Sequence, residues 1–186
     1  MSHAAGYRRA MLTIVASMER ELSALARALN QNLGPGHGQE LRVIGVGPNR
    51  AAGAVTALLS SPVHSSFGRR RAVLLLGFAG ALSPDLKTGD LILSSAYHRQ
   101  PTGATPSELS SCLSPDPGMM RLANSAAAIA GLAVRYGPSV TVDAIVREPA
   151  EKKRLHQGFP MPSENPATPV NPVTSVDMED HAVAAA

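Results

Sequence analysis

Short apolar runs alternate with segments of helical periodicity along this chain of 186 residues, and this alternation limits the folds that the chain can adopt. The run from Ala72 to Leu76 has no polar alternation, which is typical of a strand covered on both faces. The expected strands span residues 11–15, 41–46, 72–76, 90–93, 139–146 and 174–176. The expected helices span residues 19–30, 49–59, 116–133, 149–157 and 179–186. The pattern predicts an α/β protein with a central mixed, mostly parallel sheet flanked by helices.

The expected organisation is an N-terminal tail at residues 1–10, followed by one domain over residues 11–186. No window reaches the roughly 18 uninterrupted apolar residues that a membrane-spanning helix needs. The tail lacks the apolar core of a secretory signal, and the single cysteine, Cys112, excludes an internal disulfide framework. We therefore expect a cytoplasmic protein. Residues 159–172 contain five prolines, which predicts an irregular and poorly ordered segment.

Charge and composition exclude several classes of partner. The chain has 17 basic and 14 acidic residues, and aromatic residues make up 3% of it, with no tryptophan. Few aromatic side chains are therefore available for stacking on single-stranded nucleic acid, and we expect neither a nucleic-acid nor a membrane partner. The six histidines show no pairing at metal-ligand spacing, so we expect no metal ion and no cofactor.

Two glycine-containing turns follow expected strands. Gly45-Val46-Gly47 precedes a helix, but the dinucleotide fingerprint needs a third glycine where Arg50 stands. A tight strand-to-helix turn is the ordinary explanation of that segment. The second turn, Gly77-Phe78-Ala79-Gly80, follows the most apolar strand. Its two glycines, three residues apart, let backbone amides approach a ligand closely.

The run from Leu76 to Leu93 resembles the signature of the nucleoside phosphorylase and nucleosidase superfamily, in the branch that contains methylthioadenosine/S-adenosylhomocysteine nucleosidase. Three further segments agree with that branch in order and spacing. They are residues 14–21, which resemble its first strand and Met-Glu-x-Glu turn, residues 46–51, which resemble its Gly-Ile-Gly turn, and residues 176–179, which resemble its ribose-binding segment. The resemblance extends from about residue 12 to the last residue and implies a three-layer α/β/α phosphorylase-like fold.

The resemblance also assigns roles to individual residues. It implies that Glu21 deprotonates the attacking water, that Glu179 binds the ribose hydroxyls and that Met178 packs on the sugar. Without it, Glu21 and Glu19 are equivalent first-turn glutamates favoured by the helix dipole, and Met178 is a core residue. The other residues implied to bind substrate are Gly77, Phe78, Ala79, Gly80, Ile145, Val146 and Asp177.

The chain departs from this family at several positions. Asp177 stands where the nucleosidases carry another glutamate, Phe78 replaces a small hydroxyl residue, and Ile145 stands where an aromatic residue is common. The family also continues with a further strand, a Ser-Asp pair whose aspartate protonates the purine, and a long terminal helix. The resemblance therefore implies that the C-terminal strand, the helix and the general acid are missing from this sequence. We expect little turnover from it and a tendency to associate.

The resemblance implies an enzyme of purine nucleoside metabolism that cleaves an N-glycosidic bond, as in methionine salvage. The first hypothesis is hydrolysis of a nucleoside similar to 5′-methylthioadenosine or S-adenosylhomocysteine, because the Met-Glu-x-Glu turn favours a hydrolase. Two alternatives stay open. One is a phosphorylase that takes phosphate as its second substrate, including those acting on adenosyl lipids, and the other is a nucleoside-binding remnant without turnover. The resemblance further implies a homo-oligomer.

Overall fold

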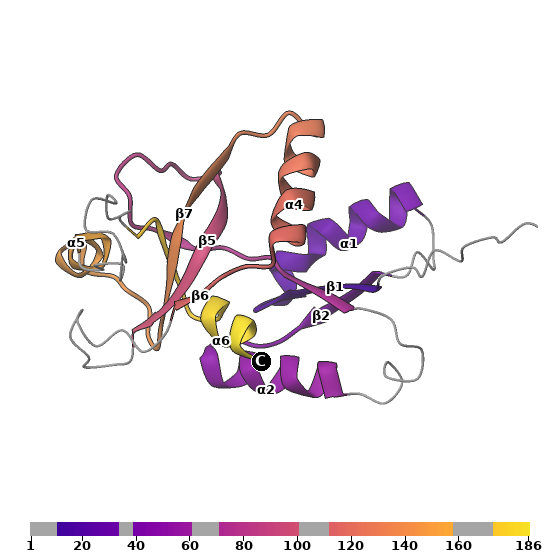
Figure 1. Cartoon of the computed structure of the whole chain (residues 1–186), viewed down its shortest axis with the longest axis horizontal. Coiled ribbons are helices and arrows are strands. Elements are labelled where there is room, and N and C mark those ends of the chain that lie inside the picture. The colour runs from indigo at the N-terminus through magenta and orange to yellow at the C-terminus, as the bar shows by residue number, and fades with distance from the viewer. Residues whose placement is uncertain (1–10, 34–38, 61–70, 101–111, 158–172) are drawn as a thin grey trace, which may run out of the picture.

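Strands alternate with helices in the computed structural model (Figure 1), which describes residues 11–33, 39–60, 71–100, 112–157 and 173–186. The expected irregular segment at residues 159–172 lies outside the described residues. The strands are β1 (Met11–Ala16), β2 (Gln39–Val43), β3 (Arg71–Leu75), β4 (Gly80–Ala81), β5 (Leu91–Gln100), β6 (Cys112–Leu113), β7 (Val134–Val142) and β8 (Ser175–Asp177). The helices are α1 (Glu19–Leu33), α2 (Pro48–Ser60), α4 (Pro117–Ile129), α5 (Pro149–Gln157) and α6 (Asp180–Ala185). None of these helices is long and apolar enough to cross a membrane.

The first three strands form a parallel sheet in the order β2-β1-β3. Successive side chains of β1 point to opposite faces of this sheet. Ile14 packs with Leu22 of α1, whereas Val15 packs with Val55 of α2 and Ala182 of α6. Helix α1 therefore covers one face, and α2 together with α6 covers the other, which gives this part of the protein its three layers (Figure 1).

Strand β3 forms from the most apolar run of the sequence, as expected, but it is less buried than expected. Leu74 packs toward α1, and Val73 and Leu75 pack toward α2, so helices do cover both faces. Among the described strands, however, β3 pairs only with β1. These side chains are half-buried, and the following residue, Leu76, is exposed.

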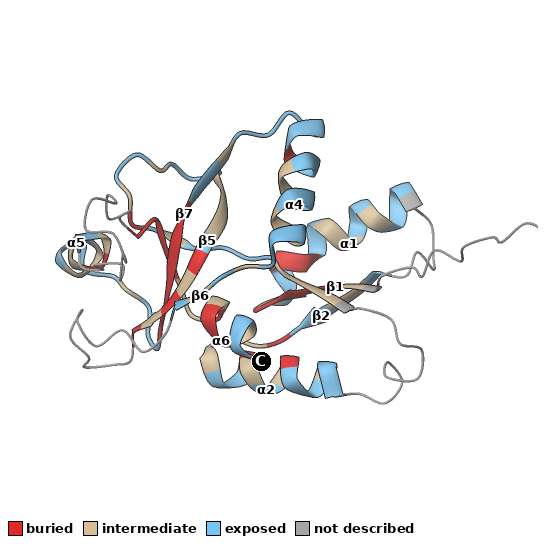
Figure 2. Cartoon of the chain, in the orientation of Figure 1, coloured by how far each residue is buried: buried red, intermediate tan, exposed pale blue. Residues whose placement is uncertain are grey.

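The other five described strands form a second sheet in the order β4-β8-β7-β5-β6, so within the described residues the expected mixed, mostly parallel arrangement is divided between two hydrogen-bonded sheets. β7 lies parallel to β5 and β8, while the short strands β4 and β6 pair antiparallel at the two edges. Buried residues concentrate along β7 and β5 (Figure 2). The core beside this sheet consists of Leu82, Val140, Val142, Leu155, Val173 and Val176.

Glycine conformation moves two element boundaries from their expected places. β2 ends at Val43, before the expected Val46, because Gly45 and Gly47 adopt φ angles of 83° and 98°, which interrupt an extended strand. Helix α2 then begins at Pro48. Asn49 therefore lies inside the first turn of that helix and is not its cap.

Helix α4 begins where the sequence predicts and ends earlier. Asp116 caps it, because its Oδ1 accepts a hydrogen bond from Met119 N (2.8 Å). The helix ends at Ile129, before the expected residue 133, because Gly131 has a φ of 66°. The N–H of Gly131 bonds back into the last turn (3.1 Å), as in a glycine-terminated helix.

The strands of the second sheet differ most from expectation. β5 is longer than the expected strand at residues 90–93, and β7 begins before the expected residue 139. The two strands pair in parallel along most of their length, with a register shift between Ser94 and Tyr97. β4 and β6, which were not expected, are two residues each and form by pairing with β8 and β5. Partners distant in sequence, which local composition does not reveal, set these boundaries.

A glycine-to-alanine substitution at Gly137 tests the packing between β7 and the segment that leads into β8, and the same substitution at Gly53 serves as its control. Gly137 is buried, and a Cβ atom at this position overlaps the Thr174 hydroxyl. Gly137→Ala should therefore lower the free energy of unfolding by about 1–3 kcal/mol or more. Gly53 lies on α2 with open space around it, so Gly53→Ala should raise that free energy by about 1 kcal/mol through helix propensity. Urea unfolding measures both variants, and a neutral Gly137→Ala would contradict this packing.

Candidate active site

Glu21 lies in the first turn of α1, shortly after the end of β1. Its side chain is 9% exposed, and both carboxylate oxygens accept backbone hydrogen bonds. Met18 N donates to Oε2 (2.8 Å) and Phe78 N donates to Oε1 (3.0 Å). Glu19, the other glutamate of this turn, is exposed. Amides from two different loops therefore fix the Glu21 carboxylate, while each oxygen has a second lone pair for another donor.

The loop after β3 passes close to Glu21 at Gly77 as well as at Phe78. A Cβ atom at Gly77 would lie 3.1 Å from Glu21 Oε1, so the lack of a side chain permits the contact. The backbone amide of Phe78 is held by Glu21, but its side chain is 74% exposed. The glycine turn thus brings a backbone amide to a buried carboxylate and leaves an aromatic ring at the surface beside it.

Glu179 lies between β8 and α6 and is 8% exposed. Its Oε1 accepts a hydrogen bond from Gly47 N (2.8 Å), in the turn after β2. Gly47 has a φ of 98°, a backbone conformation that residues other than glycine rarely adopt. Glu179 is therefore tied to the loop after β2, as Glu21 is tied to the loop after β3.

The two glutamates reach the same edge of the β2-β1-β3 sheet. Their three backbone donors, Met18, Gly47 and Phe78, follow β1, β2 and β3 in turn. Because these strands are parallel, their carboxyl ends share one edge, and open α/β sheets bind ligands at that edge. The structure thus places Glu21 and Glu179 where this architecture holds its ligands.

The Gly77–Gly80 turn also connects the loop beside Glu21 with β8. Phe78 donates to Glu21, and Gly80 pairs with Val176 of β8. A Cβ atom at Gly80 would lie 3.0 Å from the Val176 side chain. From Phe78 to Gly80 the chain spans at most about 7 Å. The strand that leads into Met178 and Glu179 therefore passes close to the loop that holds Glu21.

The remaining predicted substrate residues differ in their surroundings. Val146 and Met178 are partly buried and pack against the core of the second sheet. Ile145 is 69% exposed and Ala79 is exposed. Met178 therefore packs against the core and also lies next to Glu179 in the sequence. Ile145, in contrast, presents an apolar side chain to solvent.

Asp177 faces the protein. Its Oδ1 accepts hydrogen bonds from Thr141 Oγ1 (2.8 Å), Glu179 N (2.8 Å) and Asp180 N (2.9 Å). Its Oδ2 is inaccessible and has no hydrogen-bond partner among the described residues. Burial, followed by the charge of Asp180, raises the pKa of Asp177 well above its ordinary value.

Other titratable groups surround this carboxyl. Ser94 Oγ donates to Asp180 Oδ2 (3.4 Å). Burial and the charges of Asp180 and Asp177 raise the pKa of Tyr97 to about 12. Burial and the charge of Arg99 lower the pKa of His181, while Asp177 acts in the opposite direction. The strand-to-helix turn that carries Glu179 therefore rests on a cluster of buried and partly buried polar groups.

A cavity of about 360 Å³ lies beside the first half of β7, away from both glutamates. Arg135, Tyr136, His156 and Thr174 are among its lining residues, and none of the predicted site residues lines it. Within the described segments, no group of three or more His, Cys, Asp or Glu side chains is placed to hold a metal ion. The cavity therefore does not coincide with the carboxyl edge where the glutamates lie.

Sequence patterns do not predict two contacts of this candidate site. Gly47 was interpreted as part of a structural turn, and the two glycines of that turn are the signal for its positive φ angles, but its contact with Glu179 spans 132 residues. Thr141 was interpreted only as a strand residue. Its role depends on the pairing of β7 with β8, which no local pattern shows.

Comparison with known proteins identifies relatives of this chain. The model of the phosphorylase superfamily matches residues 14–186, whereas no curated protein sequence matches. The 5′-methylthioadenosine/S-adenosylhomocysteine nucleosidase of Campylobacter jejuni has a TM-score of 0.71 and 19% identity over 95% of this chain and 79% of its own. A Helicobacter pylori nucleosidase mutant with 5′-methylthioadenosine in its active site has a TM-score of 0.71 and 20% identity over 95% and 78%. A Helicobacter pylori futalosine hydrolase mutant has a TM-score of 0.69 and 19% identity over 94% and 82%. These similarities confirm the expected phosphorylase-like fold.

The variant Asp177→Asn tests the buried carboxyl through the pH dependence of stability. Because folding raises the pKa of Asp177, the folded state binds this proton more tightly than the unfolded chain, and the resulting stability is lost as the pH rises through the folded pKa. Asparagine keeps an acceptor oxygen and does not ionise. The free energy of unfolding of Asp177→Asn, relative to the unchanged protein, should therefore rise between about pH 4 and about pH 7.

Urea unfolding at several pH values measures this difference. The exposed Asp85 provides the control, because Asp85→Asn should show no comparable rise. The difference in the free energy of unfolding between Asp177→Asn and the unchanged protein could instead stay constant with pH. That result would mean that folding does not change the pKa of Asp177, and it would contradict the prediction.

Proposed function

The chain belongs to the phosphorylase superfamily, and from this premise we propose that it hydrolyses the N-glycosidic bond of a purine nucleoside similar to 5′-methylthioadenosine. One observation carries the proposal. Two buried carboxylates, Glu21 and Glu179, are held by backbone amides at the carboxyl edge of the same parallel sheet. A nucleosidase of this fold with 5′-methylthioadenosine in its active site supports the choice of substrate class.

Glu21 is proposed to activate the attacking water. Its two amide hydrogen bonds orient the carboxylate and leave one lone pair on each oxygen. A water molecule bound there donates a proton toward Glu21 as its oxygen attacks the anomeric carbon. The bond from that carbon to the purine nitrogen breaks at the same time, and the purine leaves with the electron pair and takes up a proton from solvent. General-base catalysis of this kind typically contributes about 10²–10⁴-fold to a rate.

Glu179 is proposed to accept hydrogen bonds from the ribose hydroxyls. Gly47 N holds its Oε1, and the other oxygen remains for the sugar. Bonds from hydroxyls to a carboxylate are among the stronger hydrogen bonds in proteins. The sugar becomes cationic as the bond to the base breaks, as in glycoside hydrolysis, so nearby negative charge stabilises the transition state more than the ground state.

Replacement of the proposed base should slow the reaction without removing the substrate. Glu21→Gln should lower the rate of adenine release from 5′-methylthioadenosine by about 10²–10⁴-fold, while the Kd for the nucleoside changes much less. Release is measured in phosphate-free buffer, and the Kd is measured by calorimetry. Glu19→Gln is the matched control, because Glu19 lies in the same turn but is exposed, and it should leave both quantities unchanged.

Two outcomes would contradict this assignment. Equal losses of rate and affinity in Glu21→Gln would remove its role as the base. A requirement for phosphate, with release of the sugar as its 1-phosphate, would replace hydrolysis by phosphorolysis.

Glu179→Ala should weaken nucleoside binding by about 1–3 kcal/mol, the usual loss for a hydrogen bond to a charged group. A nucleoside without the 2′ and 3′ hydroxyls is the control ligand, because it cannot make this hydrogen bond. It should bind the variant and the unchanged protein with similar affinity, as measured by calorimetry. If Glu179→Ala weakens both ligands equally, Glu179 does not contact the ribose hydroxyls.

A further inference from the structure

We propose that Thr141 and Asp177 form a positioning pair that aims the Glu179 carboxylate, and that neither residue contacts the substrate. This inference rests on the proposed role of Glu179 in binding the ribose. It assigns Asp177, which the sequence placed among the substrate residues, to the support of its neighbour.

The hydrogen bonds of Asp177 carry the first step. Glu179 N and Asp180 N both donate to its Oδ1 (2.8 and 2.9 Å). These two donors lie at the start of α6, so one carboxylate oxygen fixes the backbone direction with which the chain leaves β8. Glu179 is the residue at that bend, and its side-chain position follows from the backbone conformation there.

Thr141 connects the same bend to β7. Its hydroxyl donates to Asp177 Oδ1 (2.8 Å) and accepts a hydrogen bond from His181 N (2.9 Å). Thr141 and Asp177 are cross-strand partners in the parallel pairing of β7 and β8. One buried hydroxyl therefore ties the end of β8 and the first turn of α6 to the central strand of the second sheet.

Asp177 is partly buried, and neither of its carboxylate oxygens is available to a substrate. Its Oδ1 already accepts from three donors, and its Oδ2 is inaccessible. Thr141 is 1% exposed. In contrast, Glu179 reaches across to Gly47 N in the turn after β2 (2.8 Å). The pair thus acts on a substrate only through the position of Glu179.

The amide of Gly47 reports this position directly. It donates to Glu179 Oε1 and lies far from Thr141 in sequence. If the pair aims Glu179, then loss of the Thr141 hydroxyl should expose the Gly47 amide to exchange with solvent. Ile44 lies in the same segment after β2, but its N donates to Ala16 O (2.9 Å), so its exchange should not change.

The experiment compares amide hydrogen exchange of the full chain by NMR in Thr141→Val, Thr141→Ser and the unchanged protein. Thr141→Val should lower the protection of Gly47 by about tenfold, the effect of one lost hydrogen bond to a charged acceptor, with no change at Ile44. Thr141→Ser keeps the hydroxyl and should preserve protection. Asp177→Ala removes the other member of the pair, on β8, and should lower the protection of Gly47 as Thr141→Val does.

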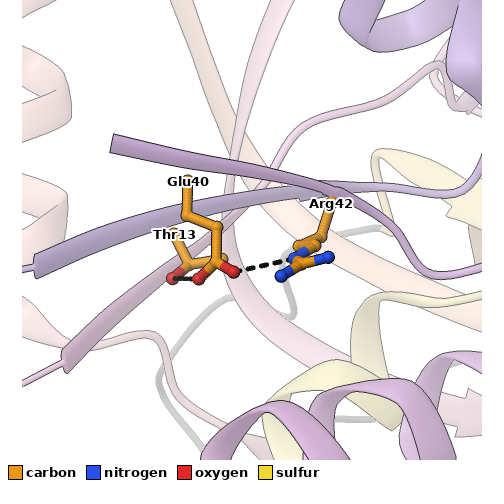
Figure 3. Close-up of polar contacts among 3 residues, drawn as sticks. All are labelled: Thr13, Glu40 and Arg42. Carbon is orange, nitrogen blue, oxygen red and sulfur yellow. Dashed lines mark hydrogen bonds and ion pairs between the residues drawn. The ribbon is translucent and has the colours of Figure 1, made fainter. Parts of the chain in front are cut away.

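Thr13→Val is the matched control for the loss of a buried threonine hydroxyl. Thr13 is fully buried on β1, and its hydroxyl donates to Glu40 Oε2 (3.2 Å), which in turn pairs with Arg42 (Figure 3). This contact lies in the first sheet and does not involve the bend at Glu179. Thr13→Val should therefore leave the protection of Gly47 unchanged relative to that of Ile44.

The Kd for the nucleoside is the second quantity to measure. Thr141→Val should raise the Kd for 5′-methylthioadenosine, and Thr141→Ser should restore it. Protection of Gly47 that is unchanged in Thr141→Val, or equally reduced in Thr141→Ser, would overturn the positioning pair. If the unchanged protein binds no nucleoside, the proposed function fails, but the exchange of Gly47 still decides whether the pair aims Glu179.

Discussion

The candidate site depends on the hydrogen bonds between two buried carboxylates and the backbone amides that hold them. A carboxylate with little exposure is costly unless donors satisfy it. Met18 and Phe78 supply donors to Glu21, and Gly47 supplies one to Glu179. Because each donor follows a different strand of one parallel sheet, these hydrogen bonds also fix the relative positions of the loops at that edge.

The layered core makes this arrangement possible. Alternating side chains of β1 bind α1 to one face of the first sheet and α2 with α6 to the other. Glu21 lies in the first turn of the helix on the first face, and Glu179 precedes the helix on the second. The sheet thus brings together two glutamates that are 158 positions apart in the sequence (179 − 21). Apolar packing sets where the helices lie, and the polar contacts then set where the carboxylates point.

The sequence predicts the kind of each major element well, because buried faces impose an apolar periodicity on β1 and α1. It predicts boundaries poorly where distant partners decide them, as in the pairing of β5 with β7 and in the two-residue strands β4 and β6. The candidate site follows the same division. Family resemblance indicated Glu21 and Glu179, whereas the roles of Thr141 and of the Gly47 amide depend on contacts between segments that only the folded chain brings together.

We propose that both carboxylates serve one nucleoside site at the carboxyl edge of the first sheet. The most direct measurement is a titration of the labelled full chain with 5′-methylthioadenosine, followed through its amide NMR signals. The amide signals of Phe78 and Gly47 should shift together and give one common Kd. Shifts confined to residues around the cavity at Tyr136 and Thr174, with Phe78 and Gly47 unchanged, would contradict it.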